Sequence, residues 1–275
     1  MRIDKDIISS RQNRDVVETV KLADRKAREK SGLFRMDGVK LAAEAAEKGV
    51  ALTRAFIRAS SLERVEKELG EALSDLRCTV VEDGVFEKMS EEKSPEGIIC
   101  IGKYLDNLKK IIKIDSGDGI FADGRRIMLA ESLRDPGNLG TVVRSAAALG
   151  CERLICSSDC ADPYNPRALR ASMGALFRTE VIFVPSMPEA ISALRENGRR
   201  VFAAALDSEA KKLGSFELLP TDCFVVGNEG HGLAEETVAS CTHSVYIPMR
   251  AGSESLNAAA AATVLLWEQE RTLIN

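Results

Sequence analysis

The chain has 275 residues, of which 45% are hydrophobic and 29% charged, as in ordinary globular proteins, and its length favours two domains. It contains no uncharged apolar run of about 18 residues, and its charged first residues lack an apolar signal core. We therefore expect a cytoplasmic protein with no membrane-spanning segment.

The cysteine and histidine content argues against metal and disulfide sites. Seven cysteines are present, an odd number, and none forms a CxxC pair. Only two histidines occur, His231 and His243, which weakens any zinc site further. We expect reduced, mostly buried thiols and no bound metal.

Charge is unevenly distributed along the chain, although its net value is only −4. Residues 1–40 contain 11 Lys and Arg against 7 Asp and Glu, and residues 114–275 contain 15 against 21. A basic N-terminal arm on an acidic body fits an anionic partner. A solvated amphipathic helix explains the same charges, so both interpretations stay open.

The N-terminal part alternates between helical and strand patterns. A charged helix over 12–30 is followed by Asp37-Gly38, a break, and by an alanine-rich helix over 39–48. Further elements are a strand over 50–58, a helix over 62–69 and short strands over 79–81 and 98–101. This pattern predicts a small α/β domain over 1–110. The turn-rich Ser116–Gly119 cluster indicates a linker over 111–125.

The C-terminal part, residues 126–275, alternates more clearly. A helix is expected over 141–149 and another over 256–270. Strand–helix alternation predicts an α/β fold with a mainly parallel sheet covered by helices on both faces. The predicted strands are 126–130, 153–156, 180–184, 201–205, 223–226 and 244–247.

Three loops rich in Gly, Asn, Ser and Pro follow predicted strands, at 131–140, 226–233 and 247–257. Ligands of parallel sheets bind where strands end and helices begin, and glycines there let a flat ligand approach the backbone. Arg144, expected in the first or second turn of its helix, can face a phosphate. The other candidates are neutral polar groups for a ribose or adenine edge and one carboxylate: Asn138, Ser255, Asn257 and Glu229.

Each loop alone also reads as a plain turn or a helix cap. The sequence has no GxGxxG after a first strand and no GxxxxGK[ST], which disfavours an ordinary dinucleotide fold and a P-loop enzyme. Residue by residue, the sequence indicates an α/β protein that binds a small ligand, with a basic N-terminal module.

The three loops, taken together and in order, resemble the three motifs of the SpoU (TrmH) methyltransferase family. The stretches are DPGNLGTVVR at 135–144, GNEGHGL at 227–233, and residues 247–257, with NPRALRASMGA at 165–175 between them. The resemblance covers about residues 125–275. The N-terminal part resembles the RNA-binding domain that precedes many members, through residues 13–21, 26–28 and 32–38.

This resemblance implies an RNA 2′-O-ribose methyltransferase that uses S-adenosylmethionine, with a deep trefoil knot and a homodimer. It implies catalytic roles for Arg144, Asn138, Glu229, Ser255 and Asn257. It implies a cofactor site made by Gly227, Asn228, Ile247, Met249 and Leu256. The residues expected to bind RNA are Lys21, Lys26, Arg28, Arg35 and Arg170.

The role of Arg144 and the substrate leave alternatives. Because an arginine stays protonated in proteins, we favour phosphate clamping by Arg144 and leave the route of the 2′-hydroxyl proton open. Ribosomal RNA is the favoured substrate because of the separate N-terminal domain, and transfer RNA is the alternative. The other hypotheses are a non-catalytic RNA-binding ribosome-assembly factor and a methyltransferase acting on protein or a small molecule.

Overall fold

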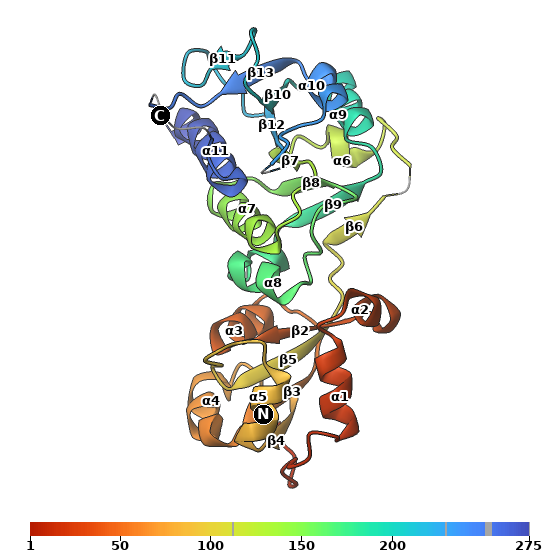
Figure 1. Cartoon of the computed structure of the whole chain (residues 1–275), viewed down its shortest axis with the longest axis vertical. Coiled ribbons are helices and arrows are strands. Elements are labelled where there is room, and N and C mark those ends of the chain that lie inside the picture. The colour runs from red at the N-terminus through yellow and green to blue at the C-terminus, as the bar shows by residue number, and fades with distance from the viewer. Residues whose placement is uncertain (112, 229, 251–254, 275) are drawn as a thin grey trace. The chain divides into compact units, whose positions relative to one another are not determined.

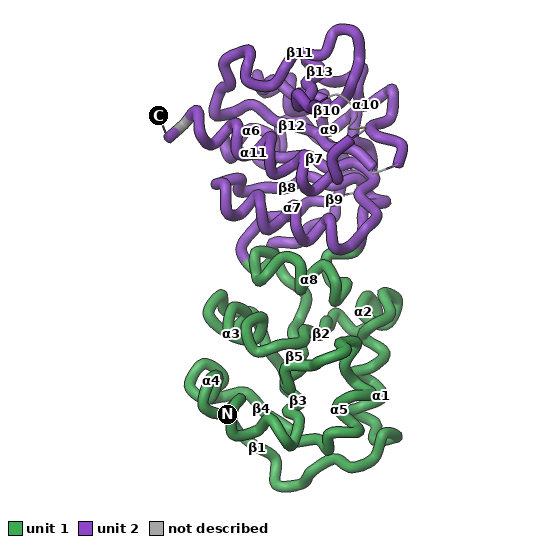
Figure 2. The backbone as a smooth tube through the Cα atoms, turned by 60° about the vertical axis from the view of Figure 1, so that its left-hand side comes forward, with its two compact units in different colours: residues 1–106, 162–177 green, residues 107–161, 178–275 purple. Residues whose placement is uncertain are grey.

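A computed structural model describes residues 1–111, 113–228, 230–250 and 255–274. The chain forms two compact units, shown in Figure 2. Unit 1 comprises residues 1–106 and 162–177, and unit 2 comprises residues 107–161 and 178–275. The expected linker at 111–125 is part of unit 2, and residues 162–177 leave the expected C-terminal domain to complete unit 1.

Unit 1 is built around a mixed five-stranded sheet in the order β1-β4-β3-β5-β2. β3 runs parallel to β4 and antiparallel to β5, and β2 pairs antiparallel with β5. The three predicted strands are present as β3, β4 and β5, whereas β1 and β2 were not predicted. The strands are β1 (Arg2–Ile3), β2 (Leu33–Asp37), β3 (Leu52–Arg58), β4 (Arg77–Val81) and β5 (Ile98–Lys103).

The helices of unit 1 differ from the prediction mainly at the N-terminus. The expected helix over 12–30 is two helices, because the Asp24 side chain accepts a hydrogen bond from the Lys26 amide at 2.7 Å and starts a new one. A helix over 83–89 was also not predicted. The helices are α1 (Arg14–Lys21), α2 (Arg25–Ser31), α3 (Val39–Glu47), α4 (Leu62–Leu69), α5 (Asp83–Met89) and α8 (Pro166–Ser172).

Residues 162–177 belong to unit 1 because polar and aromatic contacts hold them there. Arg28 is 2% exposed and pairs with Asp162 at 2.6 Å. The ring of Tyr164 stacks on that of Tyr104, with centroids 4.0 Å apart, and the Leu105 amide donates to the Tyr164 hydroxyl. α8 then packs against β2, as Figure 1 shows.

Unit 2 contains an eight-stranded sheet in the order β11-β13-β10-β12-β7-β8-β9-β6. Every pairing in it is parallel, which confirms the mainly parallel sheet. The six predicted strands are present within a residue of the expected ends, and the short outer strands β6 and β11 were missed. The strands are β6 (Leu108–Lys110), β7 (Ile127–Ala130), β8 (Arg153–Ser157), β9 (Glu180–Val184), β10 (Val201–Ala204), β11 (Lys211–Lys212), β12 (Cys223–Val226) and β13 (His243–Tyr246).

Helices cover both faces of this sheet, as Figure 1 shows. On one face, α6 and α9 pack on alternate strand residues such as Leu129, Ile155 and Val225, which form one buried cluster. On the other face, α7 packs against α11, and α11 contacts β12. The helices are α6 (Gly119–Ala122), α7 (Pro136–Ala148), α9 (Met187–Glu196), α10 (Glu235–Ser240) and α11 (Ala258–Ile274).

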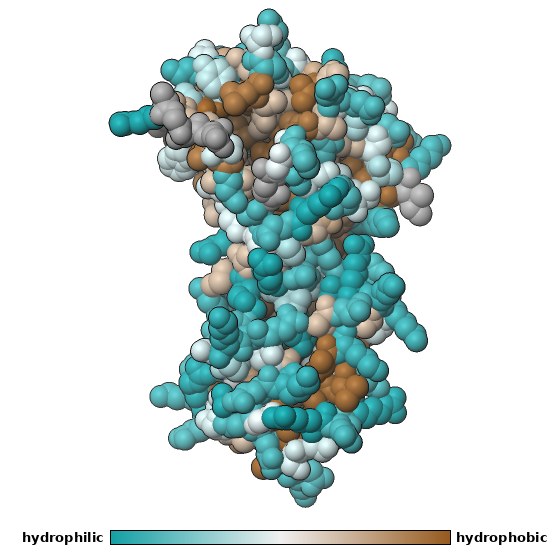
Figure 3. Space-filling model, in the orientation of Figure 1, coloured by the Kyte–Doolittle hydropathy of each residue, from teal (hydrophilic) through white to brown (hydrophobic). Residues whose placement is uncertain are grey.

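The surface carries mostly polar side chains. Figure 3 shows hydrophilic residues over much of the visible face, with apolar residues gathered in a few groups. Within the described part of the chain, no helix is both long enough and apolar enough to cross a membrane.

Candidate functional site

Three loops leave the carboxyl ends of parallel strands in unit 2. The first loop (131–135) follows β7 and the second loop (227–234) follows β12, the neighbouring strand. The third loop (247–257, of which 251–254 lie outside the described residues) follows β13, which β10 separates from β12. Because all these strands are parallel, the three loops share one edge of the sheet.

The first loop ends in a helix cap that determines where Arg144 lies. Asp135 accepts a hydrogen bond from the Asn138 amide at 2.9 Å, and Pro136 occupies the first helical position. α7 therefore begins at Pro136, five residues before the predicted start. Arg144 consequently lies in the third turn of α7, and its expected place in the first or second turn was wrong.

Arg144 is exposed, and its side chain forms no ion pair or hydrogen bond within the described residues. A surface salt bridge, the structural alternative for such a residue, is therefore not found among the described residues. A guanidinium presents five N–H donors in a planar fork that matches a phosphate or carboxylate. The free fork makes Arg144 the prime candidate in unit 2 for binding an anionic group of a substrate.

A pair of asparagines joins the first and third loops. The Asn257 side-chain amide donates to the Asn138 side-chain oxygen at 3.1 Å. The Asn257 oxygen accepts from the Ala259 amide at 2.9 Å, so the same side chain caps the start of α11. Two predicted site residues 119 positions apart are thus in direct contact.

The second loop is tight at Gly227 and tied to the first loop by Asn228. A Cβ atom on Gly227 would lie 2.4 Å from the backbone of Gly232, so no other residue fits without a backbone shift. The side-chain nitrogen of Asn228 donates to the Ser132 carbonyl at 2.9 Å, and its side-chain oxygen accepts from the backbone N–H of Gly230 at 2.8 Å. Both predicted cofactor residues are therefore part of a compact, internally bonded turn.

Ser132 is a site residue that the sequence did not single out. Its φ of +53° is in the left-handed region, which a serine rarely adopts, and such strain often occurs at functional sites. Its hydroxyl donates to Asp159 at 2.7 Å and its amide donates to the Ser157 hydroxyl at 2.7 Å. Burial raises the pKa of Asp159, but hydrogen bonds from Ser157, Ser132 and Arg134 outweigh it, and the pKa is lowered overall.

Glu131 is a second residue that the sequence reading passed over. Its carboxylate is 8% exposed, and it accepts hydrogen bonds from the Thr237 hydroxyl and from the Ala234 amide, the latter at 2.9 Å. Ala234 ends the second loop and directly precedes α10. The hydrogen bonds of Glu131 therefore tie the first loop to the end of the second loop. The sequence did contain a signal for Glu131, because this carboxylate directly follows the fully apolar strand β7.

The remaining predicted residues lie at the same edge. Met249 is 37% exposed and Leu256 40%, while Ile247 is half-buried, so apolar side chains are accessible on the third loop. Ser255 is exposed, and Glu229 lies outside the described residues. The described residues contain no cluster of His, Cys, Asp and Glu able to hold a metal ion.

The basic residues expected to bind RNA divide into two groups. Lys21 and Lys26 are exposed in unit 1. Arg28 and Arg35 are only 2% and 1% exposed. The expectation that they bind RNA was therefore wrong, and both have structural roles. Arg28 donates to two backbone carbonyls besides its ion pair, and Arg35 donates to the Met89 carbonyl at 2.6 Å. Arg170 is partly exposed and forms an ion pair with a glutamate of unit 1.

Two family profiles match parts of this chain. The sequence profile of the SpoU rRNA Methylase family matches residues 125–267, which contain all three loops. The chain belongs to this family. A second profile, the MRM3-like substrate binding domain, matches residues 13–100, within unit 1. The SpoU match includes residues 162–177, although the structure packs them into unit 1.

Individual SpoU-type relatives align over nearly the whole chain. The chain is 26% identical to the 23S rRNA (guanosine(2553)-2′-O)-methyltransferase RlmP of Bacillus subtilis, covering 94% of this chain and 97% of that protein. A crystal structure of an RNA 2′-O ribose methyltransferase superposes with a TM-score of 0.82 at 26% identity, over 98% of this chain and 100% of the other. The methyltransferase AviRb of Streptomyces viridochromogenes, solved with the cofactor AdoMet, superposes with a TM-score of 0.77 at 25% identity, over 95% and 99%.

Proposed function

We propose that this chain methylates a ribose 2′-hydroxyl of ribosomal RNA with S-adenosylmethionine as the methyl donor. The observation that carries the proposal is the exposed Arg144 on α7, whose side chain has no partner among the described residues. The first turn of the same helix holds the Asn138–Asn257 pair, and both lie within the region that matches the SpoU family. A structural arginine would have an internal partner, as Arg28 and Arg35 have.

The residues at the sheet edge fit the cofactor. Gly227 lets the second loop fold back tightly against Gly232, and Met249 and Leu256 offer accessible apolar contacts to a flat ring. We propose that these three, with Asn228 and Ile247, hold S-adenosylmethionine. When bound, it supplies an electrophilic methyl group on a sulfonium, so the protein mainly has to position the acceptor.

The chain's own residues then bind and orient the RNA. Arg144 clamps a phosphate next to the reacting ribose through two parallel N–H donors and stabilises negative charge as the 2′-hydroxyl loses its proton. The hydrogen bond between Asn138 and Asn257 holds the start of α7 next to the end of the third loop. Glu229 and Ser255, which the family resemblance also implicates, complete this proposed site.

Ribosomal RNA is the proposed substrate class because RlmP acts on 23S rRNA and residues 13–100 match a substrate-binding domain. Lys21 on α1 and Lys26 on α2, both exposed, are the proposed phosphate contacts of unit 1. Cytoplasmic ribosome assembly would bring the protein to this substrate.

The family resemblance also implies a homodimer and a deep trefoil knot, and we propose both for this chain. The exposed apolar side chains of α11, Trp267 at 53% and Ile274 at 68%, fit a subunit contact on that helix. Light scattering behind a sizing column would test the dimer, with Trp267→Glu expected to give monomers. A crystal structure would test the knot.

Transfer of tritiated methyl from S-adenosylmethionine to RNA tests the function directly. The RNA is total RNA from cells that lack the protein, followed by size fractionation and alkaline hydrolysis. We expect alkali-resistant label in ribosomal RNA, because a 2′-O-methyl group blocks cleavage. Label in small RNA would point to transfer RNA instead. Bound cofactor with no label in any RNA would indicate a binding-only factor.

The proposed phosphate contacts are tested by salt dependence. Lys21→Gln with Lys26→Gln should weaken RNA binding and reduce the slope of log affinity against log salt by roughly 1 to 2. Lys211→Gln with Lys212→Gln, which removes the same charge from exposed residues of β11, is the matched control. An unchanged slope in the first variant would count against the assigned contacts.

A further inference from the structure

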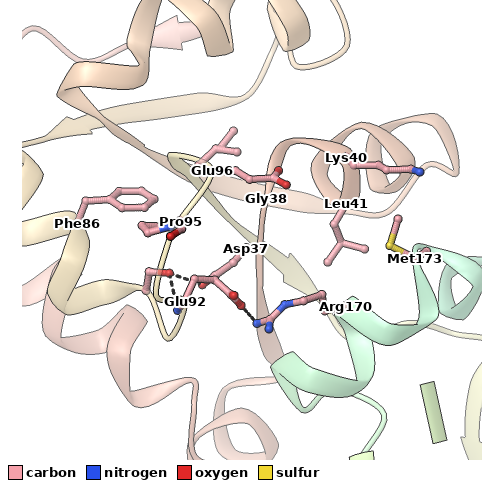
Figure 4. Close-up of a pocket in the computed structure, with 13 residues that line it drawn as sticks. Asp37, Gly38, Lys40, Leu41, Phe86, Glu92, Pro95, Glu96, Arg170 and Met173 are labelled. Atoms are coloured by element: carbon pink, nitrogen blue, oxygen red, sulfur yellow. Dashed lines mark hydrogen bonds and ion pairs between the residues drawn. The ribbon is translucent and has the colours of Figure 1, made fainter. Parts of the chain in front are cut away.

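Each unit has a cluster of polar side chains outside the residues assigned to the proposed function. In unit 1, the cluster borders a cavity of about 160 Å³, which Figure 4 shows. Asp37 accepts a hydrogen bond there from the Ser90 hydroxyl at 3.1 Å, and Arg170 pairs with Glu92. These contacts stay within unit 1. The cluster of unit 2, at the carboxyl edge of its sheet, is instead bonded to the proposed cofactor loop.

The cluster of unit 2 surrounds the carboxylate of Asp159. This residue lies in the turn 157–160, which follows β8, the strand next to β7. Its Oδ2 accepts from the Ser132 hydroxyl at 2.7 Å, and its Oδ1 accepts from the Ser157 hydroxyl at 2.6 Å. The Ser157 oxygen in turn accepts from the Ser132 amide at 2.7 Å. The three residues therefore form a closed ring of hydrogen bonds.

This ring holds the strained backbone of Ser132. At a φ of +53°, the Cβ of a non-glycine residue lies too close to the backbone, so the residue tends to relax to a negative φ. The angle φ is the rotation about the N–Cα bond. The ring binds the amide nitrogen at one end of that bond and, through the side-chain hydroxyl, the Cα at the other end. Loss of Asp159 removes the second of these restraints.

The backbone of Ser132 determines how the second loop is held. Its carbonyl accepts from the side-chain nitrogen of Asn228 at 2.9 Å. The side-chain oxygen of Asn228 accepts from the amides of Gly230 at 2.8 Å and His231 at 3.2 Å. A change in φ at Ser132 would swing this carbonyl away from Asn228. The Asn228 side chain would then lose the contact that orients its oxygen toward the second loop.

We propose that Asp159 is a positioning residue, which holds Asn228 and the second loop in their cofactor-binding form through Ser132. Asp159 acts through Ser132 and has no contact of its own with the cofactor in this assignment. Its side chain is 44% exposed, so its replacement leaves no buried cavity. The inference rests on the proposed function and adds a residue that lies in none of the three loops.

Calorimetric titration of the full chain with S-adenosylmethionine tests the proposal. Asp159→Ala should bind the cofactor about tenfold more weakly, the low end of the range for one hydrogen bond to a charged group. Ser132→Ala breaks the same hydrogen bond and should lose a similar amount. The two changes together should lose no more than the larger single loss, because they act on one contact. Glu196→Ala, which removes an exposed carboxylate from the last residue of α9, is the matched control.

Rescue experiments separate positioning from other roles of the carboxylate. Glycine adopts a positive φ without steric cost, so after Ser132→Gly the further change Asp159→Ala should lower the affinity by less than about twofold. Asp159→Asn can still accept from one serine and donate to the other, so it should bind the cofactor more tightly than Asp159→Ala. If Asp159 acted only by attracting the sulfonium charge, the two variants would be equally weak.

Two further measurements use other properties of the same variants. Amide hydrogen exchange in the free protein should be faster in second-loop peptides of Asp159→Ala than of the wild type, and it should return toward the wild-type rate in Asp159→Asn. The affinity for ribosomal RNA should not change, because the proposed phosphate contacts of unit 1 are intact. All variants should keep a cooperative thermal transition.

Four results would overturn the proposal. They are an Asp159→Ala cofactor affinity equal to that of the wild type, a loss that persists in full after Ser132→Gly, an Asp159→Asn variant as weak as Asp159→Ala, and second-loop exchange that does not change. Normal methyl transfer by the wild type together with any of these would reject the positioning role and keep the proposed function. The expected pattern of cofactor affinities with no labelled RNA would reject the function and keep the positioning role. A wild type that binds no cofactor would reject both.

Discussion

Replacing Arg144 by alanine should abolish most turnover and leave the fold intact. The side chain is exposed and has no partner among the described residues, so its removal leaves no buried charge or broken hydrogen bond. Surface substitutions of this kind change the free energy of unfolding by about 0.5 kcal/mol or less. The thermal midpoint of Arg144→Ala should therefore equal that of the wild type within a few degrees.

The loss of activity follows from the contacts proposed for the guanidinium. A hydrogen bond to a charged group contributes about 1.5 to 3 kcal/mol, and a two-point clamp on a phosphate contains two of them. A loss of about 3 kcal/mol in the transition state corresponds to roughly 100-fold in rate. Arg144→Lys keeps the charge but not the planar fork, so its rate should lie between those of the wild type and Arg144→Ala.

The assay is single-turnover transfer of labelled methyl to ribosomal RNA, with cofactor affinity measured separately by calorimetry. Arg144→Ala should bind S-adenosylmethionine like the wild type. Arg195→Ala, which removes an arginine from α9, is the control and should keep its rate. A rate within threefold of the wild type for Arg144→Ala, or a matching loss of cofactor affinity, would refute the role of phosphate clamp.

Three further substitutions test other parts of the structure. Gly227→Ala should lower cofactor affinity at least tenfold in calorimetry, because the new Cβ meets backbone at 2.4 Å; unchanged affinity would contradict the cofactor site. Asp162→Asn should cost about 3 kcal/mol in urea unfolding, because it leaves the Arg28 guanidinium buried without its anion; a cost under 1 kcal/mol would argue against the structural role of Arg28. For Asp37, the folded-state pKa is raised above its usual value, so wild-type stability is lost as pH rises through that pKa. Asp37→Asn should therefore be more stable than the wild type at pH 7 and lose that advantage below about pH 4, and a pH-independent difference would exclude the raised pKa.

The sequence was sufficient to predict the three candidate loops of unit 2 because such loops are local features. The strands that support them are short apolar runs, and a fully parallel sheet brings their carboxyl ends to one edge. Contacts across that edge were not predictable in the same way. The strained φ of Ser132 and the hydrogen bond between Asn138 and Asn257 depend on the relative placement of loops far apart in the sequence.

The division between the units was harder to predict because it depends on long-range contacts, among them an ion pair and a tyrosine stack. Arg28 lies in a basic stretch and looks like a surface residue, but its partner Asp162 is 134 positions away. Nothing local distinguishes Arg28 from its exposed neighbour Lys26. This contact, together with the stacking of Tyr164 on Tyr104 and the packing of α8 on β2, holds residues 162–177 in unit 1 although they belong to the matched SpoU region.

Burial and internal partners distinguish the basic residues that stabilise the fold from those that are available to bind RNA. Arg28 and Arg35 have carbonyl or carboxylate partners inside unit 1, and burial without them would be costly. Lys21, Lys26 and Arg144 are exposed, and an exposed unpaired cation costs little in the free protein and gains most when a phosphate arrives.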